Sequence, residues 1–374
     1  MKKAFIPWLA AGLAVVISVF VLFHFTARPT YFFSASLPKS SDTISRPGAL
    51  FDDPIQTTGF EIPATSKYKH LQVFILAGNV TADNRRYVTL QMALETKMVT
   101  VRETGEVNEL QIDNHSGEYI YINSGDIVKG GKQDRTIQYD VIIPPHKMAI
   151  NIASFCVEHG RWTQRQNEAV GNFEKSESSL SSKELKIAAK HAKSQEKVWE
   201  KVSKYQDKAN YEYNKAAPSD RPVDVKSAVS SSSLQLTLDN ETIKQSKEDY
   251  RKQFAALKNT KRGAGLAYYI NGKLYGVDLF NNHQLFTDLF DKLLDAAITE
   301  AISESIASSD KKLLTNLDHL LLANAKVYED LDVNEITRFQ SSETPNYKDL
   351  VIFTTIDKTV KTWLHRNWLD KTED

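Results

Sequence analysis

The sequence predicts an α+β fold: an antiparallel β-sheet or sandwich core with long amphipathic helices, preceded by a single N-terminal transmembrane helix. Three observations carry this prediction. Short strand-like segments joined by turn sequences follow one another between about residues 71 and 157. Helix-like segments come mostly after them, and such segregation is typical of α+β folds rather than of alternating βαβ units. The 374 residues are 41% apolar and 25% charged, as expected for a folded body of about two domains or one large one.

The chain begins with an almost unbroken apolar run. Residues 4–23 carry no charged side chain, and a helix of about twenty residues spans about 30 Å, the thickness of a bilayer core. Lys2 and Lys3 precede the run, so the positive-inside rule places the N-terminus in the cytoplasm. We therefore expect residues 1–25 to be a signal-anchor that leaves the body extracytoplasmic, either periplasmic or at the cell surface.

A cleaved signal peptide is the main alternative, and it would make the protein secreted. The apolar core of a signal peptide is usually only about 7–15 residues long, which is shorter than this run. Ser34-Ala35-Ser36 is a weak cleavage site further along, and a buried core helix is a third alternative. Residues 26–58 are rich in Ser, Thr and Pro and are expected to be a linker. The remaining residues, 59–374, form the predicted body.

The first half of the body is expected to be a meander of strands with one short helix. Glu103–Glu106 and Pro144–Lys147 are turn sequences between apolar segments. Thr89 is expected to cap a helix that ends near Thr96. The strands are expected over residues 71–76, 98–102, 107–112, 119–122, 136–143 and 148–157.

The second half is expected to hold most of the long helices, together with a hairpin and a late strand. Residues 181–210 contain no glycine or proline and show a mildly apolar helical face, which predicts one long helix. Asn271-Gly272 predicts a tight hairpin between residues 265–270 and 273–279. Further helices are expected over residues 242–258, 284–306 and 311–323, with a strand at 351–355 and a short aromatic-rich end at 363–369.

Composition excludes some classes of function. The chain has 47 Lys and Arg and 47 Asp and Glu, so it lacks the basic excess of a general nucleic-acid binder. Its single cysteine, Cys156, forms no intrachain disulfide and builds no multi-cysteine metal site. The nine histidines are scattered without an H-x-H or H-E-x-x-H pattern, so no metal site is assigned. Carboxylates alone can hold Mg²⁺ or Ca²⁺, and Asp126, Asp134, Asp140 and Glu158 are available, but their spacing selects no metal.

The densest group of functional residue types lies in Gly125–Arg135, with the sequence GDIVKGGKQDR. Glycines let the backbone approach a ligand, and Lys132 and Arg135 could hold an anion. The spacing is not that of a phosphate-binding P-loop, because Gln133 follows Lys132. The simpler interpretation is a glycine bend between strands with solvated charges.

A second group follows in Cys156–Trp162, with the sequence CVEHGRW. If a strand continues to Glu158, Cys156 and Glu158 share a face and His159 lies on the other. That geometry disfavours a Cys–His nucleophile pair, and an isolated cysteine is more often a small buried residue. Glu158 and Arg161 form either a structural ion pair or a general base beside a substrate that Arg161 holds.

Together these two motifs resemble the ARG-and-rhodanese-phosphatase-superfamily-associated protein domain, a domain of unknown function. Ser194-Gln195 through Val198-Trp199 resembles a family helix motif, and the resemblance covers about residues 58–300. It implies a place in ADP-ribose or NAD-derived nucleotide metabolism. Three positions depart from the family pattern: Asp126 replaces Glu, Gly131 replaces Ala and Asp134 replaces Asn.

Two functional hypotheses follow. In the first, the body binds or processes a nucleotide-type ligand through Lys132, Gln133, Asp134, Arg135 and Arg161, with Glu158 as the catalytic base. In the second, which we favour, the protein is a membrane-tethered binding or interaction module, and the same residues form an internal network. A protein partner is then expected, Cys156, Trp162, Gln195 and Trp199 are structural or site residues, and no cofactor is specified.

Whether the protein is an enzyme stays open at this level, and a hydrolase that uses Cys156 is a third alternative. Burial separates the first two hypotheses. An open pocket lined by Lys132, Arg135 and Glu158 would favour ligand binding there, whereas pairing beneath the surface would favour the internal network.

Overall fold

The computed structural model describes residues 60–161, 171–179, 182–216, 222–307, 317, 321 and 325–372. These residues belong to one compact unit, Phe51–Asp374. The predicted membrane span at residues 4–23 and the linker at residues 26–58 lie outside them. No helix among the described residues has both the length and the apolar character needed to cross a membrane.

Most strands pair antiparallel, and helices pack against the sheets, so the predicted α+β class holds. The largest sheet has eight strands in the order β1-β2-β12-β13-β17-β16-β15-β14. The predicted Asn271-Gly272 hairpin is confirmed, because it joins β12 to β13. The strands are β1 (Phe60–Tyr68), β2 (Leu71–Gly78), β12 (Gly263–Ile270), β13 (Lys273–Phe280), β14 (Lys326–Asp332), β15 (Thr337–Thr344), β16 (Tyr347–Asp357) and β17 (Thr362–Asp370).

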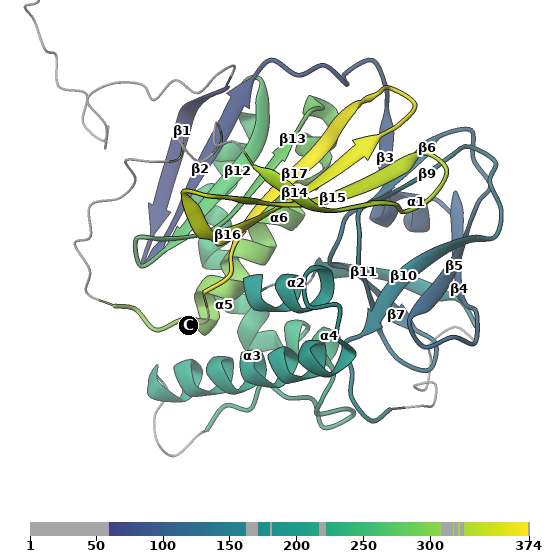
Figure 1. The fold of residues 1–374 in the computed structure, drawn as a ribbon. Helices are drawn as coiled ribbons and strands as arrows, with labels where there is room; N and C mark the ends of the chain where they lie inside the picture. Colours follow the sequence, from purple (N-terminus) through teal and green to yellow (C-terminus); the bar gives the residue numbers. More distant parts are fainter. Residues whose placement is uncertain are drawn as a thin grey trace, which may run out of the picture. The chain divides into compact units, whose positions relative to one another are not determined.

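The centre of this sheet is buried on both faces, which explains the continuous apolar runs in its strands. Leu71, Val73 and Ile75 of β2 point into one core cluster, whereas Phe74 and Leu76 point into another. Helices α5 (Glu241–Phe254) and α6 (His283–Ser303) complete the first cluster, and Figure 1 shows them on the same side of the sheet. A short 3-10 helix, η1 (Ala255–Asn259), follows α5.

Two smaller sheets carry the first half of the body. A six-stranded sheet has the order β11-β7-β8-β10-β5-β4, and a three-stranded sheet has the order β3-β6-β9 with one parallel pair, β3 with β6. Helix α1 (Leu90–Glu95) is capped by Thr89, as predicted. The strands are β3 (Tyr87–Thr89), β4 (Val99–Glu103), β5 (Glu109–Asn114), β6 (Tyr119–Ile122), β7 (Asp126–Gly130), β8 (Arg135–Ile137), β9 (Val141–Ile143), β10 (Ile150–Cys156) and β11 (Phe173–Ser179).

Two predicted elements are wrong in the same way, because each is two elements. The strand predicted over residues 136–143 divides into β8 and β9, which belong to different sheets. The helix predicted over residues 181–210 divides into α2 (Lys183–Lys190) and α3 (Gln195–Ala216), with Lys193 in the left-handed conformation between them (φ 50°). The predicted aromatic-rich end is strand β17, and most of the helix predicted over 311–323 lies outside the described residues.

Helices α2, α3 and α4 (Leu234–Leu238) cover one face of the six-stranded sheet. Ile127 of β7 and Phe155 of β10 pack against Leu185, Val198 and Leu234 of the three helices. This packing holds both sequence motifs in place, because β7 is the first part of the first motif and β10 ends at the start of the second.

Candidate functional site

The first motif is a hairpin between β7 and β8 that turns on two adjacent glycines. Gly130 and Gly131 have φ values of +125° and +55°, in the left-handed range that glycine adopts most readily. A Cβ atom on Gly131 would lie 2.6 Å from Glu103 Oε1 and 2.8 Å from the ring of Phe173. The glycine bend between strands is therefore present, and it is closely packed.

The charged residues of this motif are turned inward. Gln133 and Asp134 are fully buried and Arg135 is 4% exposed, whereas the Lys132 side chain is exposed. The Arg135 guanidinium donates to Gln133 Oε1 (3.1 Å) and to Cys156 Sγ (2.6 Å). Asp134 Oδ1 accepts from the backbone N–H of Gly130 (3.1 Å). The simpler interpretation, a bend with solvated charges, therefore fits Lys132, which is exposed, and in part Lys129, which is half-buried, but not Asp134 or Arg135.

Glu158 and Arg161 of the second motif pack against the first motif. The strand ends at Cys156, and Glu158 forms an isolated antiparallel bridge with Ser233. Arg161 Nε donates to Glu158 Oε2 (2.7 Å), and its Nη1 donates to the carbonyl of Gly131 (3.2 Å). A further nitrogen of Arg161 lies 3.7 Å from Asp134 Oδ1. Glu158 is fully buried and the Arg161 side chain is 10% exposed, so this pair lies at the edge of the interior.

Cys156 and Gln195 tie the second motif to helix α3. Gln195 Oε1 accepts from the Cys156 backbone N–H, and Gln195 Nε2 donates to the Cys156 carbonyl, both at 2.8 Å. The amide therefore replaces a neighbouring strand at the end of β10. The Cys156 thiol is buried, and this burial raises its pKa to about 11 despite the nearby Arg135. It is a neutral thiol at physiological pH, which is a poor nucleophile.

The motif residues therefore form one connected set, which we call the motif frame: Gln133, Asp134, Arg135, Cys156, Glu158, Arg161 and Gln195. Gln133 Nε2 joins its two halves by donating to the Glu158 carbonyl (3.0 Å). Of the other predicted site residues, Lys132 lies outside the frame, and Trp162 lies outside the described residues.

An open surface lies directly beside the frame. Two adjoining concavities of about 760 Å³ and 470 Å³ share His159, Lys226, Ser231 and Ser232. We call them together the His159 groove. The Trp199 ring forms one wall and meets the imidazole of His159 edge to face, with 4.6 Å between ring centroids. The ends of two sequence motifs, Gly160-Arg161 and Trp199, therefore meet at this groove.

Sequence reasoning did not predict a second buried polar cluster, which lies between α2 and the sheets. His365 of β17 is hydrogen-bonded to Asp140 and Asp278, and all three are less than 9% exposed. Lys186 and Lys190 of α2 are 6% and 3% exposed beside them. Lys183, Lys186 and Lys190 recur at helical spacing, which places them on one face of the helix. This spacing is the one feature of the sequence that points to the buried cluster, but lysines on one face of a helix are usually solvated.

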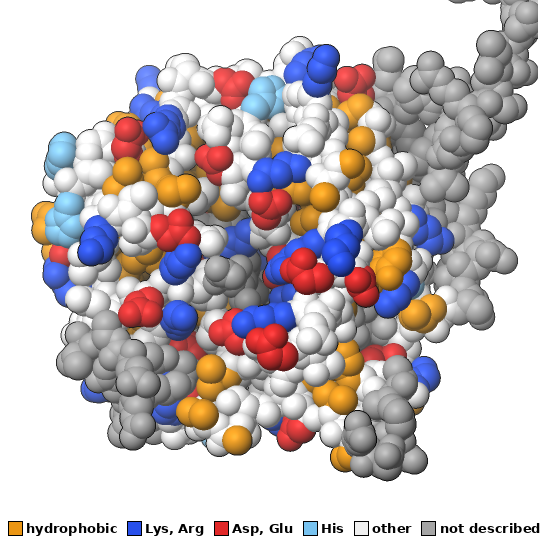
Figure 2. All heavy atoms as spheres, turned by 180° about the vertical axis from the view of Figure 1, so that it is seen from behind, with side chains coloured by type: hydrophobic (Ala, Val, Ile, Leu, Met, Phe, Trp, Pro, Cys, Tyr) orange, Lys and Arg blue, Asp and Glu red, His pale blue; other side chains and the backbone are white. Residues whose placement is uncertain are grey.

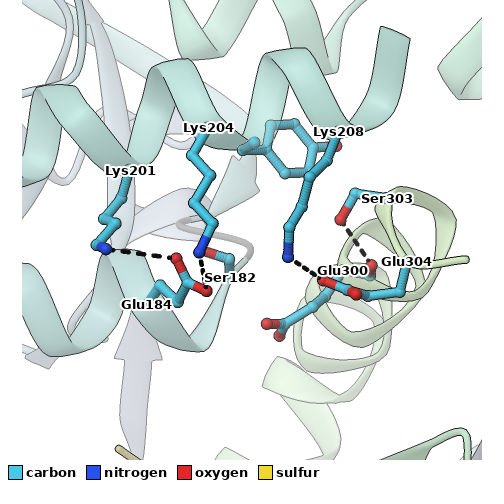
Figure 3. Close-up of a pocket in the computed structure, with 9 residues that line it drawn as sticks. Ser182, Glu184, Lys201, Lys204, Lys208, Glu300, Ser303 and Glu304 are labelled. Atoms are coloured by element: carbon cyan, nitrogen blue, oxygen red, sulfur yellow. Dashed lines mark hydrogen bonds and ion pairs between the residues drawn. The ribbon is translucent and has the colours of Figure 1, made fainter. Parts of the chain in front are cut away.

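A third charged cluster holds α3 against its neighbours. Figure 3 shows Lys201, Lys204 and Lys208 projecting from α3 toward acidic side chains at the start of α2 and the end of α6. Lys204 lies 2.9 Å from Glu184, and Lys208 lies 2.6 Å from Glu304. The cavity among them is about 10 Å³, close to the least volume that holds one water. This cluster is therefore a set of interhelical ion pairs and not a ligand pocket.

On one face of the molecule the surface charge is mixed in sign. Figure 2 shows Lys and Arg side chains interspersed with Asp and Glu across the face opposite to that of Figure 1. No extended field of one sign is visible on this face, so it is not the kind of surface that steers a polyanion toward a protein.

Comparison with known proteins places the chain in a family. The profile of the ARG and Rhodanese-Phosphatase-superfamily-associated Protein domain matches residues 59–367. This range contains both motifs and all the strands of the three sheets except the last three residues of β17. No characterised protein and no solved structure gives a significant match. The chain is a member of the ARG and Rhodanese-Phosphatase-superfamily-associated Protein domain family.

Proposed function

We propose that the protein is a membrane-tethered, extracytoplasmic binding module that recognises its ligand at the His159 groove. Residues 4–23 are the tether in this proposal. The motif frame holds the groove in shape and takes no part in chemistry.

The observation that carries this proposal is that the frame residues are hydrogen-bonded mainly to one another beneath the surface. Gln133 donates to the Glu158 carbonyl, Arg135 donates to Gln133, and Arg161 donates to the Gly131 carbonyl. Arg135 Nε is the exception, because it is buried with no hydrogen-bond partner among the described residues. A catalytic group must reach the reacting atoms of a substrate, within about 3 Å or through one water. Glu158 is fully buried and bonded to Arg161, so a positioning role suits it better than that of a general base.

The groove has the properties of a small-molecule site. Its two parts have volumes within the range of about 300–1,000 Å³ that ligand pockets occupy. Trp199 and His159 provide aromatic surface, and the serines at 227 and 230–232 provide polar contacts. Lys226 adds a cation that is also paired with Asp207 (2.8 Å). The lining also includes the carboxylates of Asp224, Glu196 and Glu200. A ring stacked on Trp199 with a phosphate near Lys226 would use these groups. A nucleotide-type ligand such as ADP-ribose is therefore the ligand class that we propose first.

Thermal unfolding of the full chain in detergent with ADP-ribose, NAD, nucleotides and sugar phosphates tests this proposal. A ligand at about 100 times its Kd stabilises the folded state by about 2.7 kcal/mol, a shift of a few degrees for a body of this size. We expect Trp199→Ala to abolish the shift. Tyr211→Ala is the matched control, because Tyr211 is an exposed aromatic residue (64%) on the same helix.

The outcomes separate the hypotheses. A shift that survives Trp199→Ala but disappears in Lys132→Ala would place the ligand at the first motif and overturn the assignment to the groove. Turnover of any ligand in the panel, lost in Glu158→Gln with the fold intact, would overturn the non-catalytic role of the frame.

A further inference from the structure

His365 lies between two carboxylates deep inside the molecule. Its Nδ1 is 2.7 Å from Asp140 Oδ2, and its Nε2 is 3.1 Å from Asp278 Oδ1. The ring also stacks on Phe280, with 4.2 Å between centroids and 7° between planes. We call His365, Asp140 and Asp278 together the His365 clasp.

The hydrogen bonds of the clasp fix the charge of the ring. A carboxylate only accepts hydrogen bonds, whereas a neutral imidazole has one N–H donor. Two contacts to ionised aspartates therefore require both ring nitrogens to carry a proton. Asp140 also accepts from Thr355 Oγ1 (2.6 Å) and from the Ser124 backbone N–H (2.7 Å), so its oxygens are already committed as acceptors.

The clasp connects parts of the molecule that are distant in sequence. Asp140 lies between β8 of the six-stranded sheet and β9 of the three-stranded sheet. Asp278, Thr355 and His365 belong to β13, β16 and β17 of the eight-stranded sheet. Ser124 lies in the turn before β7, which leads into the first motif. The hydrogen bond between Asp140 and His365 therefore connects the end of β8, in the six-stranded sheet that carries the motif frame, to the eight-stranded sheet.

We propose that the His365 clasp is a pH-sensitive joint between the sheets, closed while the imidazole carries both protons and weakened when the ring loses one. Deprotonation would remove one of the two hydrogen bonds and leave two buried carboxylates without their shared cation. The other titratable groups that face the clasp from the elements packed around it are Lys186 and Lys190 of α2, Tyr121 of β6, Tyr268 of β12, and the Asp126–Lys292 ion pair of β7 and α6.

The direction of the pH effect follows from the charges. Burial by itself lowers the pKa of His365, but Asp140 and Asp278 outweigh it and raise the pKa above its ordinary value of 6.5. The folded state then holds more protons than the unfolded state above pH 6.5. Stability from this group is complete below pH 6.5 and is lost as the pH rises through the folded pKa.

Two neighbouring groups set the window in which the joint can be measured. Burial raises the pKa of Glu300 from 4.5 to about 7, so its carboxyl is half-titrated there and its stabilisation still falls above pH 7. Burial lowers the pKa of Lys190 from 10.5 to about 8, so it is half-titrated there and its effect on stability has the opposite sign. Between about pH 7 and 8 these two contributions oppose each other, and the NMR titration identifies the part that belongs to His365.

The test combines a direct titration with a stability profile of the full chain in detergent. NMR of the protein labelled at the histidine Cε1 carbon follows each imidazole from pH 5 to 9, and His365→Gln assigns the signal. We expect His365 to keep both protons above pH 6.5. Urea unfolding at pH 7 and 8 should then show the unfolding equilibrium constant rising by up to tenfold.

The variants decide whether the clasp causes this slope. Asp278→Asn removes one carboxylate and should lower the titration point of His365 and flatten the slope, whereas His115→Gln should leave both unchanged. The proposal is overturned if His365 titrates at or below pH 6.5, or if Asp278→Asn keeps the full slope. The NMR titration needs no variant beyond the one used for assignment, and the His365 signal can instead be assigned by Asp278→Asn should His365→Gln fail to fold.

Discussion

Gly130 and Gly131 show how single residues build the frame. Their left-handed backbone turns the chain back at the end of β7, and this turn directs Gln133, Asp134 and Arg135 into the interior. At this scale the motif is structural: two glycines set the turn, and the buried side chains that follow hydrogen-bond mainly to the frame and the backbone. Removing a single donor should leave several acceptors unsatisfied.

Arg135→Ala should lower the free energy of unfolding by about 3 kcal/mol, because it leaves buried polar partners without a donor. Lys132→Ala is the matched control, since Lys132 is exposed, and surface substitutions usually change stability by less than about 0.5 kcal/mol. Urea unfolding monitored by tryptophan fluorescence measures both. Equal, small effects of the two variants would show that Arg135 is not part of a structural network.

Cys156 should react with thiol reagents only when the protein opens. Its pKa of about 11 leaves little thiolate at neutral pH, and its side chain is buried. We expect labelling by a water-soluble disulfide reagent at pH 7.5 to be at least about 100-fold slower in the native protein than in urea. Rapid labelling of the folded protein would contradict the structural role of this thiol.

At the scale of elements, a tight turn or a helix cap can be predicted from a few neighbouring residues, because those residues alone determine it. Asn271-Gly272 predicts its hairpin because the turn type needs those residues, and Thr89 predicts its helix because it is the N-cap. The break between α2 and α3 has no glycine or proline to mark it, and Lys193 adopts the left-handed conformation there. The separation of β8 from β9 depends on pairing with different sheets, which no local pattern reports.

Glu300 of α6 contacts α2, and its contribution to stability should depend on pH. Its carboxylate accepts from the Lys183 backbone N–H and from the Tyr268 hydroxyl, both at 2.8 Å. Because burial raises its pKa to about 7, the folded state binds an extra proton between pH 4.5 and 7, and the stability from this group falls as the pH rises through that range.

Glu300→Gln should remove this part of the pH profile. Its amide oxygen can still accept from the Lys183 backbone N–H, and its NH2 group can donate to the Tyr268 hydroxyl oxygen in place of the present bond. The stability of the variant relative to the wild type should rise by on the order of 3 kcal/mol between pH 4.5 and 7.5. Urea unfolding at the two pH values measures it, and Glu304→Gln is the control at the surface end of α6. A constant difference between wild type and variant would show that Glu300 ionises normally.

For the whole molecule, the motifs say more about how distant segments of the chain pack together than about any reaction that they catalyse. Gln195 is 39 residues from Cys156 and Asp140 is 225 residues from His365, yet each pair is in contact. Charge and spacing identify Arg135, Glu158 and Arg161 as a group, but they do not say whether these residues face solvent or each other. The cluster around His365 could not be predicted, because its members come from separate strands with no motif in common.

The membrane tether is a prediction about the whole chain. We expect the full protein to stay in the membrane fraction after carbonate extraction, and a chain that lacks residues 1–25 to be soluble. Protease added outside intact cells, or to the periplasm after permeabilisation, should reach the body. A soluble mature form with a new N-terminus near Ser36 would contradict the anchor and support a cleaved signal peptide.

The central claim is that the motif residues form an internal frame and not a substrate-facing site. A double-mutant cycle on Glu158 and Arg161, measured by urea unfolding without any ligand, tests it most directly. The variants are Glu158→Gln, Arg161→Ala and the double substitution. We predict that each single variant is destabilised and that the coupling energy exceeds about 1 kcal/mol, as for buried residues in one network. Single variants as stable as the wild type, with coupling near zero, would contradict the frame.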